Sequence, residues 1–334
     1  MKGLFLNVIK SVFILIGTYI GAGFISGNEI YLFFGKYKVC GVLGLLISTI
    51  FMGIILYKII IFSREENINN YNDLLKKIIN RKIIYIIINK IMNIYFLILF
   101  CLMTSGLCNF INQQFNINKI IIYLIFLLLN VVFIKNKNNF IIKINTFVMP
   151  IILIFLVYIL GISVHKNNYF PIQFEYKNNF IIPAIIYSSY NLLNLIPISI
   201  TSLYRANKIK KIIIIFCSII FLLKIIVFLI LNYTENNYLN LDFPIIFFLE
   251  KIGYFYKNIY CIIIVLATVT TAISVEYALV QKNNKNLKII IICSLLSINF
   301  TFSNLLKIVY PVFGIIGLIQ LFFFLTYKKI HHFK

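Results

Sequence analysis

The chain has 334 residues, of which 61% are hydrophobic and only 12% are charged, and its formal net charge is +22. Soluble domains carry about 25% charged residues, so this composition excludes a soluble protein and indicates one embedded in lipid. The positive charge does not indicate nucleic-acid binding, because the Lys and Arg residues lie in short loops between apolar stretches rather than along one face.

Apolar stretches recur along the whole chain and predict an all-α membrane protein with about ten transmembrane helices. The predicted spans are residues 4–34, 39–62, 83–111, 119–134, 140–164, 180–203, 211–232, 254–281, 287–303 and 305–327. Spans 4 and 9 are short, and only Ser303 and Asn304 separate the last two spans. No soluble segment of domain size remains, so residues 1–334 are expected to form a single transmembrane domain.

Positive charge alternates between the loops, which predicts the orientation of the chain. The N-terminus, the loops after spans 2, 4, 6 and 8, and the C-terminal tail hold most of the Lys and Arg residues. Cytoplasmic loops carry this excess, so both termini are expected in the cytoplasm of a bacterium, with the chain in its inner membrane.

The segment 64–82 is expected to be an amphipathic interfacial helix or a solvated loop. The segment 233–250 is expected to be an outside loop.

The first span contains the most polar stretch within a predicted membrane helix. Between Gly17 and Glu29 it holds four glycines, several hydroxyl groups, Asn28 and the Glu29 carboxylate. Glycine weakens helix formation, so the stretch is expected to unwind and to turn backbone groups toward a ligand. The glycines also fit G-x-x-x-G helix packing, but packing does not explain the adjoining Asn28 and Glu29.

The sixth span contains a second polar interruption, from Tyr187 to Asn194, followed by Pro197. These residues predict a discontinuous helix, and paired interruptions in two halves of a chain indicate a transporter binding site. The alternative is a proline kink lined by polar packing residues. Met149-Pro150 in span 5 and Tyr310-Pro311 in span 10 suggest two five-span repeats, about 4–164 and 180–327, which an odd number of spans places in inverted topology.

Other polar groups within the spans are candidates for ion coupling. Thr270, Thr271 and Ser274 share one face of span 8, where their hydroxyl groups could bind a monovalent cation or bond back to their own helix. Glu29 and Lys224 are buried charges and candidates for proton coupling. The histidines have no metal-ligand spacing and no catalytic constellation is present, so neither an enzyme nor a cofactor other than Na+ is expected.

Several motifs resemble one family in the same order along the chain. Gly21–Glu29 followed by Phe33-Phe34-Gly35, Tyr187–Asn191, Thr270–Ser274 and Tyr310–Gly314 are similar to the pattern of YkvI-type bacterial membrane proteins of the amino acid–polyamine–organocation superfamily. The resemblance implies a LeuT-type fold of five plus five helices in inverted repeat, with helices 1 and 6 broken.

The same resemblance implies the positions of the sites. A substrate would lie between helices 1 and 6, and a sodium ion between helices 1 and 8. The implied substrate-binding residues are Gly21, Ala22, Gly23, Phe24, Ser26, Gly27, Tyr187, Ser188 and Asn191, and the implied ion-binding residues are Gly21, Ala22, Thr270, Thr271 and Ser274.

These observations together predict a secondary active transporter of a small polar solute, an amino acid or a related amine or acid, coupled to Na+ or H+ by alternating access. The expected partners are the solute and the lipid bilayer, with no nucleic acid. The alternative is a membrane sensor or receptor subunit that binds a solute in the same pocket without transporting it.

Overall fold

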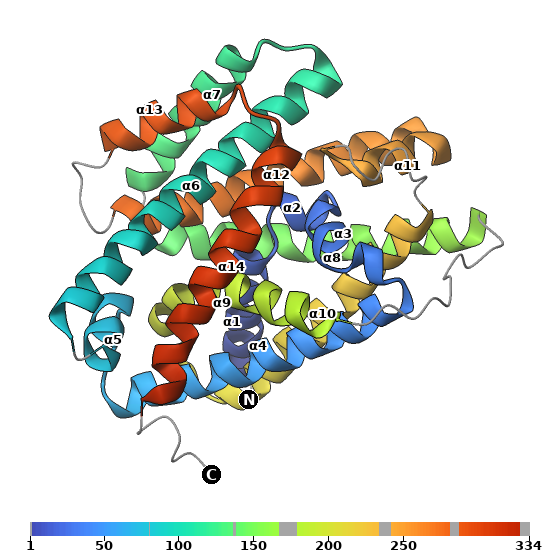
Figure 1. Cartoon of the computed structure of the whole chain (residues 1–334). Helices are drawn as coiled ribbons and strands as arrows, with labels where there is room; N and C mark the ends of the chain where they lie inside the picture. The colour runs from blue at the N-terminus through green and yellow to red at the C-terminus, as the bar shows by residue number, and fades with distance from the viewer. Residues whose placement is uncertain are drawn as a thin grey trace.

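The structure is a computed structural model that describes residues 2–79, 81–135, 138–166, 179–233, 242–280 and 287–327. Within these ranges the regular secondary structure is entirely helical (Figure 1). The helices are α1 (Lys2–Tyr19), α2 (Ala22–Ile25), α3 (Asn28–Phe34), η1 (Gly35–Tyr37), α4 (Val39–Glu65), α5 (Tyr71–Ile78), α6 (Lys82–Phe115), α7 (Lys119–Lys135), α8 (Asn138–Lys166), α9 (Ile181–Leu203), α10 (Ile209–Tyr233), α11 (Pro244–Ile252), α12 (Tyr254–Val280), α13 (Leu287–Ser297) and α14 (Phe302–Thr326).

Six helices in the described ranges are long and apolar enough to cross a bilayer, namely α4, α6, α9, α10, α12 and α14. Shorter apolar helical stretches lie within α1, α7 and α8. Large apolar side chains are exposed on the outside of the bundle, and Leu128, Ile154 and Leu222 are 60% exposed or more. A surface of this kind is stable only against lipid, so the predicted all-helical membrane protein is confirmed.

The helices from the first predicted span occupy the centre of the molecule (Figure 1). The long helix α1 packs against α8, α9, α10 and α12, and the short helix α3 contacts α4, α9, α10 and α14. Helices α7 and α13 lie beside α6 at the edge of the bundle. Helix α1 begins and α14 ends toward the same side of the molecule.

The predicted break in the sixth span is wrong, because α9 is one continuous helix from Ile181 to Leu203 with Pro197 inside it. Its polar side chains bond within the helix: Ser188 donates to the Ala184 carbonyl (2.6 Å) and Asn191 to the Tyr187 carbonyl (3.0 Å). Since a polar side chain can satisfy itself on the preceding turn, such residues do not require the backbone to unwind.

Three further observations concern the segments between spans, and the amphipathic helix expected in one of them is present. Helix α13 ends at Ser297 and α14 begins at Phe302, so the last two spans meet a few residues before the predicted boundary. The segment 64–82 contains the amphipathic helix α5, whose first turn is capped when the Asp73 amide donates to the Asn70 side chain (2.8 Å). Part of the predicted outside loop 233–250 forms α11.

Candidate functional site

The first span is interrupted twice, at the two glycine positions where the sequence predicts unwinding. Helix α1 ends at Tyr19, and Gly21 is extended (φ −112°, ψ −176°) before the single turn of α2. Gly27 then has φ +86°, a left-handed conformation that strains any residue with a side chain, before α3 begins at Asn28. The interruption therefore places backbone carbonyls and amides at the centre of the bundle.

Helix α12 holds the interrupted segment from one side. The Thr271 hydroxyl lies 3.1 Å from the Ile20 carbonyl oxygen and 2.8 Å from the Ala267 carbonyl oxygen of its own helix. The Tyr260 hydroxyl donates to the Ile25 carbonyl. The hydroxyl of Thr271 and the Ile20 carbonyl thus converge on the first interruption, as two hard oxygen ligands of a monovalent cation would.

Glu29 begins the second half of the broken span and lies in the protein interior, with 2% of its surface exposed. Tyr187 and Asn191 of α9 are its polar neighbours. Among the described residues, its carboxylate oxygen Oε1 has no hydrogen-bond partner. A buried oxygen of this kind costs free energy unless a ligand or a proton satisfies it, so Glu29 is the strongest indication of a binding site in the described chain.

Gly23 lies where Glu29 approaches α14. A Cβ atom on Gly23 would stand 2.6 Å from the Tyr310 hydroxyl oxygen and 3.2 Å from Glu29 Oε2. The Tyr310 ring is stacked on Tyr190, with ring centroids 4.3 Å apart. The absence of a side chain at Gly23 therefore lets both the carboxylate and the tyrosine hydroxyl approach the α2 backbone.

Lys224 of α10 is a second buried charge, with none of its surface exposed. Its Nζ donates to Ser48 Oγ (3.0 Å) and Thr49 Oγ1 (2.9 Å) of α4. The same nitrogen lies 4.9 Å from the ring centroid of Tyr187 and 5.5 Å from that of Tyr19. Two hydroxyl oxygens and two aromatic rings thus surround an ammonium group that has no carboxylate within salt-bridge distance among the described residues.

Tyr187 connects the two buried charges. Its hydroxyl lies 2.5 Å from the Tyr19 hydroxyl, its ring faces Lys224, and its polar end neighbours Glu29. Phe33 and Phe34 pack edge-on against the same ring, each with a centroid separation of 5.2 Å. The site is thus a cluster of packed aromatic rings around one buried carboxylate and one buried ammonium group.

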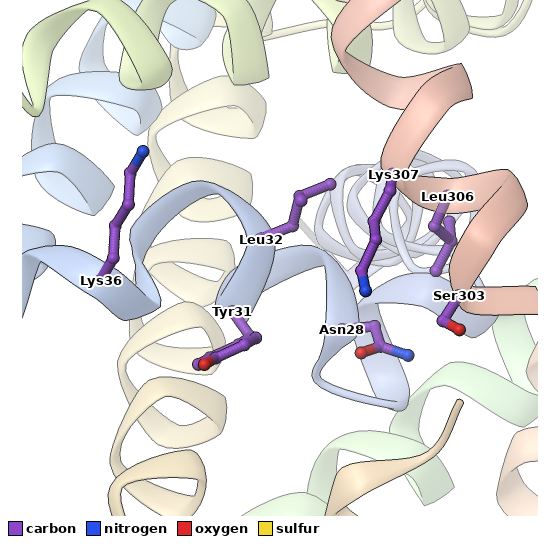
Figure 2. A pocket seen from close by; sticks show the side chains of 7 residues that line it. All are labelled: Asn28, Tyr31, Leu32, Lys36, Ser303, Leu306 and Lys307. Atoms are coloured by element: carbon purple, nitrogen blue, oxygen red, sulfur yellow. The ribbon is translucent and has the colours of Figure 1, made fainter. Parts of the chain in front are cut away.

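A cavity of about 250 Å³ lies between α3, the helix that carries Glu29, and α14 (Figure 2). Asn28, Tyr31 and Ser303 supply polar groups to it, and in Figure 2 the Lys307 ammonium points toward Asn28. Asp242 links the two helices: its carbonyl accepts from Asn28 Nδ2 (2.6 Å) and its carboxylate accepts from the Ser303 amide (2.7 Å). Asn28 lines this cavity, whereas the adjacent Glu29 does not.

The structure brings most of the predicted site residues to this region. Residues Gly21 to Glu29 form the interruption. Four predicted residues from other helices lie beside it, namely Tyr187, Asn191, Lys224 and Thr271. Ser188 faces α4, where it bonds to the Ser48 carbonyl (3.0 Å). Thr270 bonds to the Ala267 carbonyl (3.0 Å), and the side chain of Ser274 lies outside the described residues.

Other residues of the site are not in the sequence-based prediction. Ser48 and Thr49 form a polar pair in an otherwise apolar stretch of span 2, a signal comparable to the hydroxyl groups of span 8. Tyr260 carries no such signal, because tyrosines are common in this chain and only the fold places it against the interruption. Tyr19 lies within the polar stretch of the first span, but nothing in the sequence shows that it contacts Tyr187.

Comparisons with known proteins agree with this description. The chain is 25% identical over 187 residues to YkvI, an uncharacterized membrane protein of Bacillus subtilis (strain 168), in an alignment that covers 54% of this chain and about half (52%) of YkvI. The structure also matches Mhp1, a nucleobase-cation-symport-1 family transporter in a closed conformation with bromovinylhydantoin bound, with a TM-score of 0.55 and 14% identity. That match covers 94% of this chain and 71% of Mhp1.

At 14% identity the match to Mhp1 shows a shared fold, and no family model matches the chain. The predicted resemblance to YkvI-type membrane proteins is nevertheless confirmed: the chain is a homologue of YkvI with a transporter fold.

Proposed function

We propose that this protein is a secondary active transporter of a small polar solute, an amino acid or a related amine or acid. The observation that carries the proposal is the buried Glu29 carboxylate, which has an unpartnered oxygen beside the interruption of the first span. Interrupted helices at the centre of a membrane bundle are where secondary transporters bind solutes and coupling ions.

The groups around the interruption define what could bind there. An ammonium or amide group of the solute would donate to Glu29 Oε1, and the Tyr187 and Tyr310 hydroxyls would offer further donors and acceptors. The surrounding aromatic rings would cover the apolar part of the solute. The solved Mhp1 structure holds bromovinylhydantoin, a small polar ring compound, which adds hydantoins to the solutes to be tested.

Two features are candidates for the coupling ion. The Thr271 hydroxyl and the Ile20 carbonyl, with Gly21, Ala22, Thr270 and Ser274 nearby in the sequence, favour Na+ between α12 and the interruption. The buried Glu29 and Lys224 favour H+, because either group can lose its charge by exchanging a proton.

Alternating access would follow from the way in which the site is built. The interrupted span and α9 would move together against the remaining helices, since the contact between Tyr19 and Tyr187 joins them.

We extend the proposal to a ten-span inverted repeat with both termini in the cytoplasm of a bacterium. The shared side on which α1 begins and α14 ends supports an even number of spans (Figure 1).

Thermal unfolding of the purified protein tests ligand binding. The protein is heated with individual amino acids, amines and hydantoins, each in NaCl and in KCl at equal ionic strength, because a ligand of the native state raises the midpoint. A solute-specific rise that requires Na+ supports sodium coupling, and a rise that is indifferent to Na+ supports proton coupling. If no member of these classes raises the midpoint of the wild type, the proposed solute class is wrong.

A further inference from the structure

A groove of about 540 Å³ runs between α4 and α10 on the outside of the bundle. Its walls are mostly apolar, and Ile50, Ile54 and Ile214 are each more than half exposed. Both helices are long and apolar enough to span the membrane, so the groove opens toward the bilayer. An acyl chain is the abundant apolar ligand at this position.

Two lysines line the groove, and both lie near one end of it. Lys58 stands close to the end of α4 and Lys210 close to the beginning of α10. These helix ends meet, because Arg64 Nη2 donates to the Leu203 carbonyl (2.6 Å) and to the Ala206 carbonyl in the connection that leads to α10. Among the described residues, neither lysine is paired with a carboxylate, so two positive charges remain available at this end.

The length of the groove fits one leaflet of the bilayer. The segment of α4 from Leu46 to Lys58 lines it and rises by about 18 Å at about 1.5 Å per residue. Half of a hydrocarbon core of about 30 Å is about 15 Å. With the lysines at the level of the head groups, the apolar walls would therefore extend to the middle of the membrane.

We propose that this groove is a binding site for one anionic phospholipid, with an acyl chain along α4 and α10 and the phosphate at Lys58 and Lys210. The lysine-rich loops after spans 2 and 6 place this end in the cytoplasmic leaflet, where anionic lipids give the surface a negative potential. The groove is separate from the buried aromatic cluster but adjoins it, because Thr49 lines the groove and accepts a hydrogen bond from Lys224.

Native mass spectrometry of the purified, delipidated protein tests the site. Phosphatidylglycerol and phosphatidylcholine with identical acyl chains are titrated separately, and the first adduct is quantified. Phosphatidylglycerol is expected to bind more tightly, and Lys58→Ala and Lys210→Ala are each expected to weaken it about fivefold, as the attraction of one basic residue to an anionic membrane predicts.

Matched variants control for nonspecific attraction and for folding. Lys211→Ala removes an exposed positive charge one residue from Lys210 that does not line the groove, so binding is expected to be unchanged. Ile214→Trp fills the groove and is expected to weaken binding, whereas Leu222→Trp, on the same helix and also exposed, is not. Equal binding of the two lipids, or an equal loss in Lys211→Ala and Lys210→Ala, would overturn the proposal.

Discussion

The hydroxyl groups of Tyr19 and Tyr187 lie 2.5 Å apart, and the rings of both tyrosines flank the buried ammonium group of Lys224. Tyr19 is the last residue of α1, immediately before the interruption, whereas Tyr187 belongs to the continuous helix α9. One contact thus joins the broken span to α9 beside the buried ammonium group.

Two substitutions of Tyr187 distinguish the contribution of its hydroxyl group from that of its ring. Tyr187→Phe removes the contact with Tyr19 but keeps a ring over Lys224, so solute binding is expected to weaken and stability to fall by about 1–3 kcal/mol, because the buried Tyr19 hydroxyl loses this partner. Tyr187→Leu also removes the ring and is expected to lower the unfolding midpoint further, since a buried cation–π contact contributes about 2 kcal/mol. Thermal unfolding with and without solute measures both effects. Equal unfolding midpoints of the two variants would show that the ring contributes nothing to stability beyond the hydroxyl group.

Gly23→Ala tests the close approach of Tyr310 and Glu29. The added Cβ would stand 2.6 Å from the Tyr310 hydroxyl oxygen, so the variant is expected to lose about 1–3 kcal/mol of stability through overpacking. Adding Tyr310→Phe removes the closest atom and is expected to restore part of the loss. Gly161→Ala is the control, because no atom of the described residues lies within 4 Å of its new Cβ. An unfolding midpoint that stays unchanged in Gly23→Ala would show that the approach is not tight.

Thr271→Val tests the proposed sodium position. The substitution keeps the shape of the side chain and removes the oxygen that faces the Ile20 carbonyl, so stabilisation by NaCl over KCl is expected to disappear. Thr268→Val is the matched control, because the Thr268 hydroxyl bonds to the Ile264 carbonyl of its own helix (2.6 Å). Loss of the sodium effect in both variants would indicate a general change in α12 instead of a lost ligand.

Glu29→Gln and Lys224→Met test whether the two buried charges compensate each other. Each single substitution leaves one charge in the interior, so each is expected to destabilise the protein, and the double variant to lose less than the sum of the two. A coupling of about 0.5–3 kcal/mol is expected from the unfolding midpoints of this double-mutant cycle. Strict additivity would show that the charges act independently.

Much of this fold could be predicted from the sequence because lipid imposes simple rules on it. Apolar length indicates the helices, and the glycines between Gly17 and Gly27 indicate the interruption in the first span. The same reasoning failed for α9, since a stretch containing Ser188, Asn191 and Pro197 can either break a helix or bond back to its preceding turn. The sequence alone does not distinguish these outcomes.

The sequence predicts those residues of the candidate site whose charged side chains cost free energy within a membrane span. Glu29 and Lys224 stand out in any apolar span, and both are buried near the interruption. The partners of Lys224, which are Ser48, Thr49 and Tyr19, come from other helices, and these contacts depend on how distant spans pack. Which helix faces which is set by tertiary packing, which a single sequence does not reveal.

The most direct test of the transporter proposal is counterflow in liposomes that contain the purified protein. The liposomes are loaded with an excess of an unlabelled solute that raises the unfolding midpoint, and a radiolabelled trace of the same solute is added outside. The proposal predicts transient accumulation of label inside, weakened by Glu29→Gln and unchanged by Gly161→Ala. Binding that raises the midpoint without any accumulation would contradict transport and indicate a receptor that holds its solute in place.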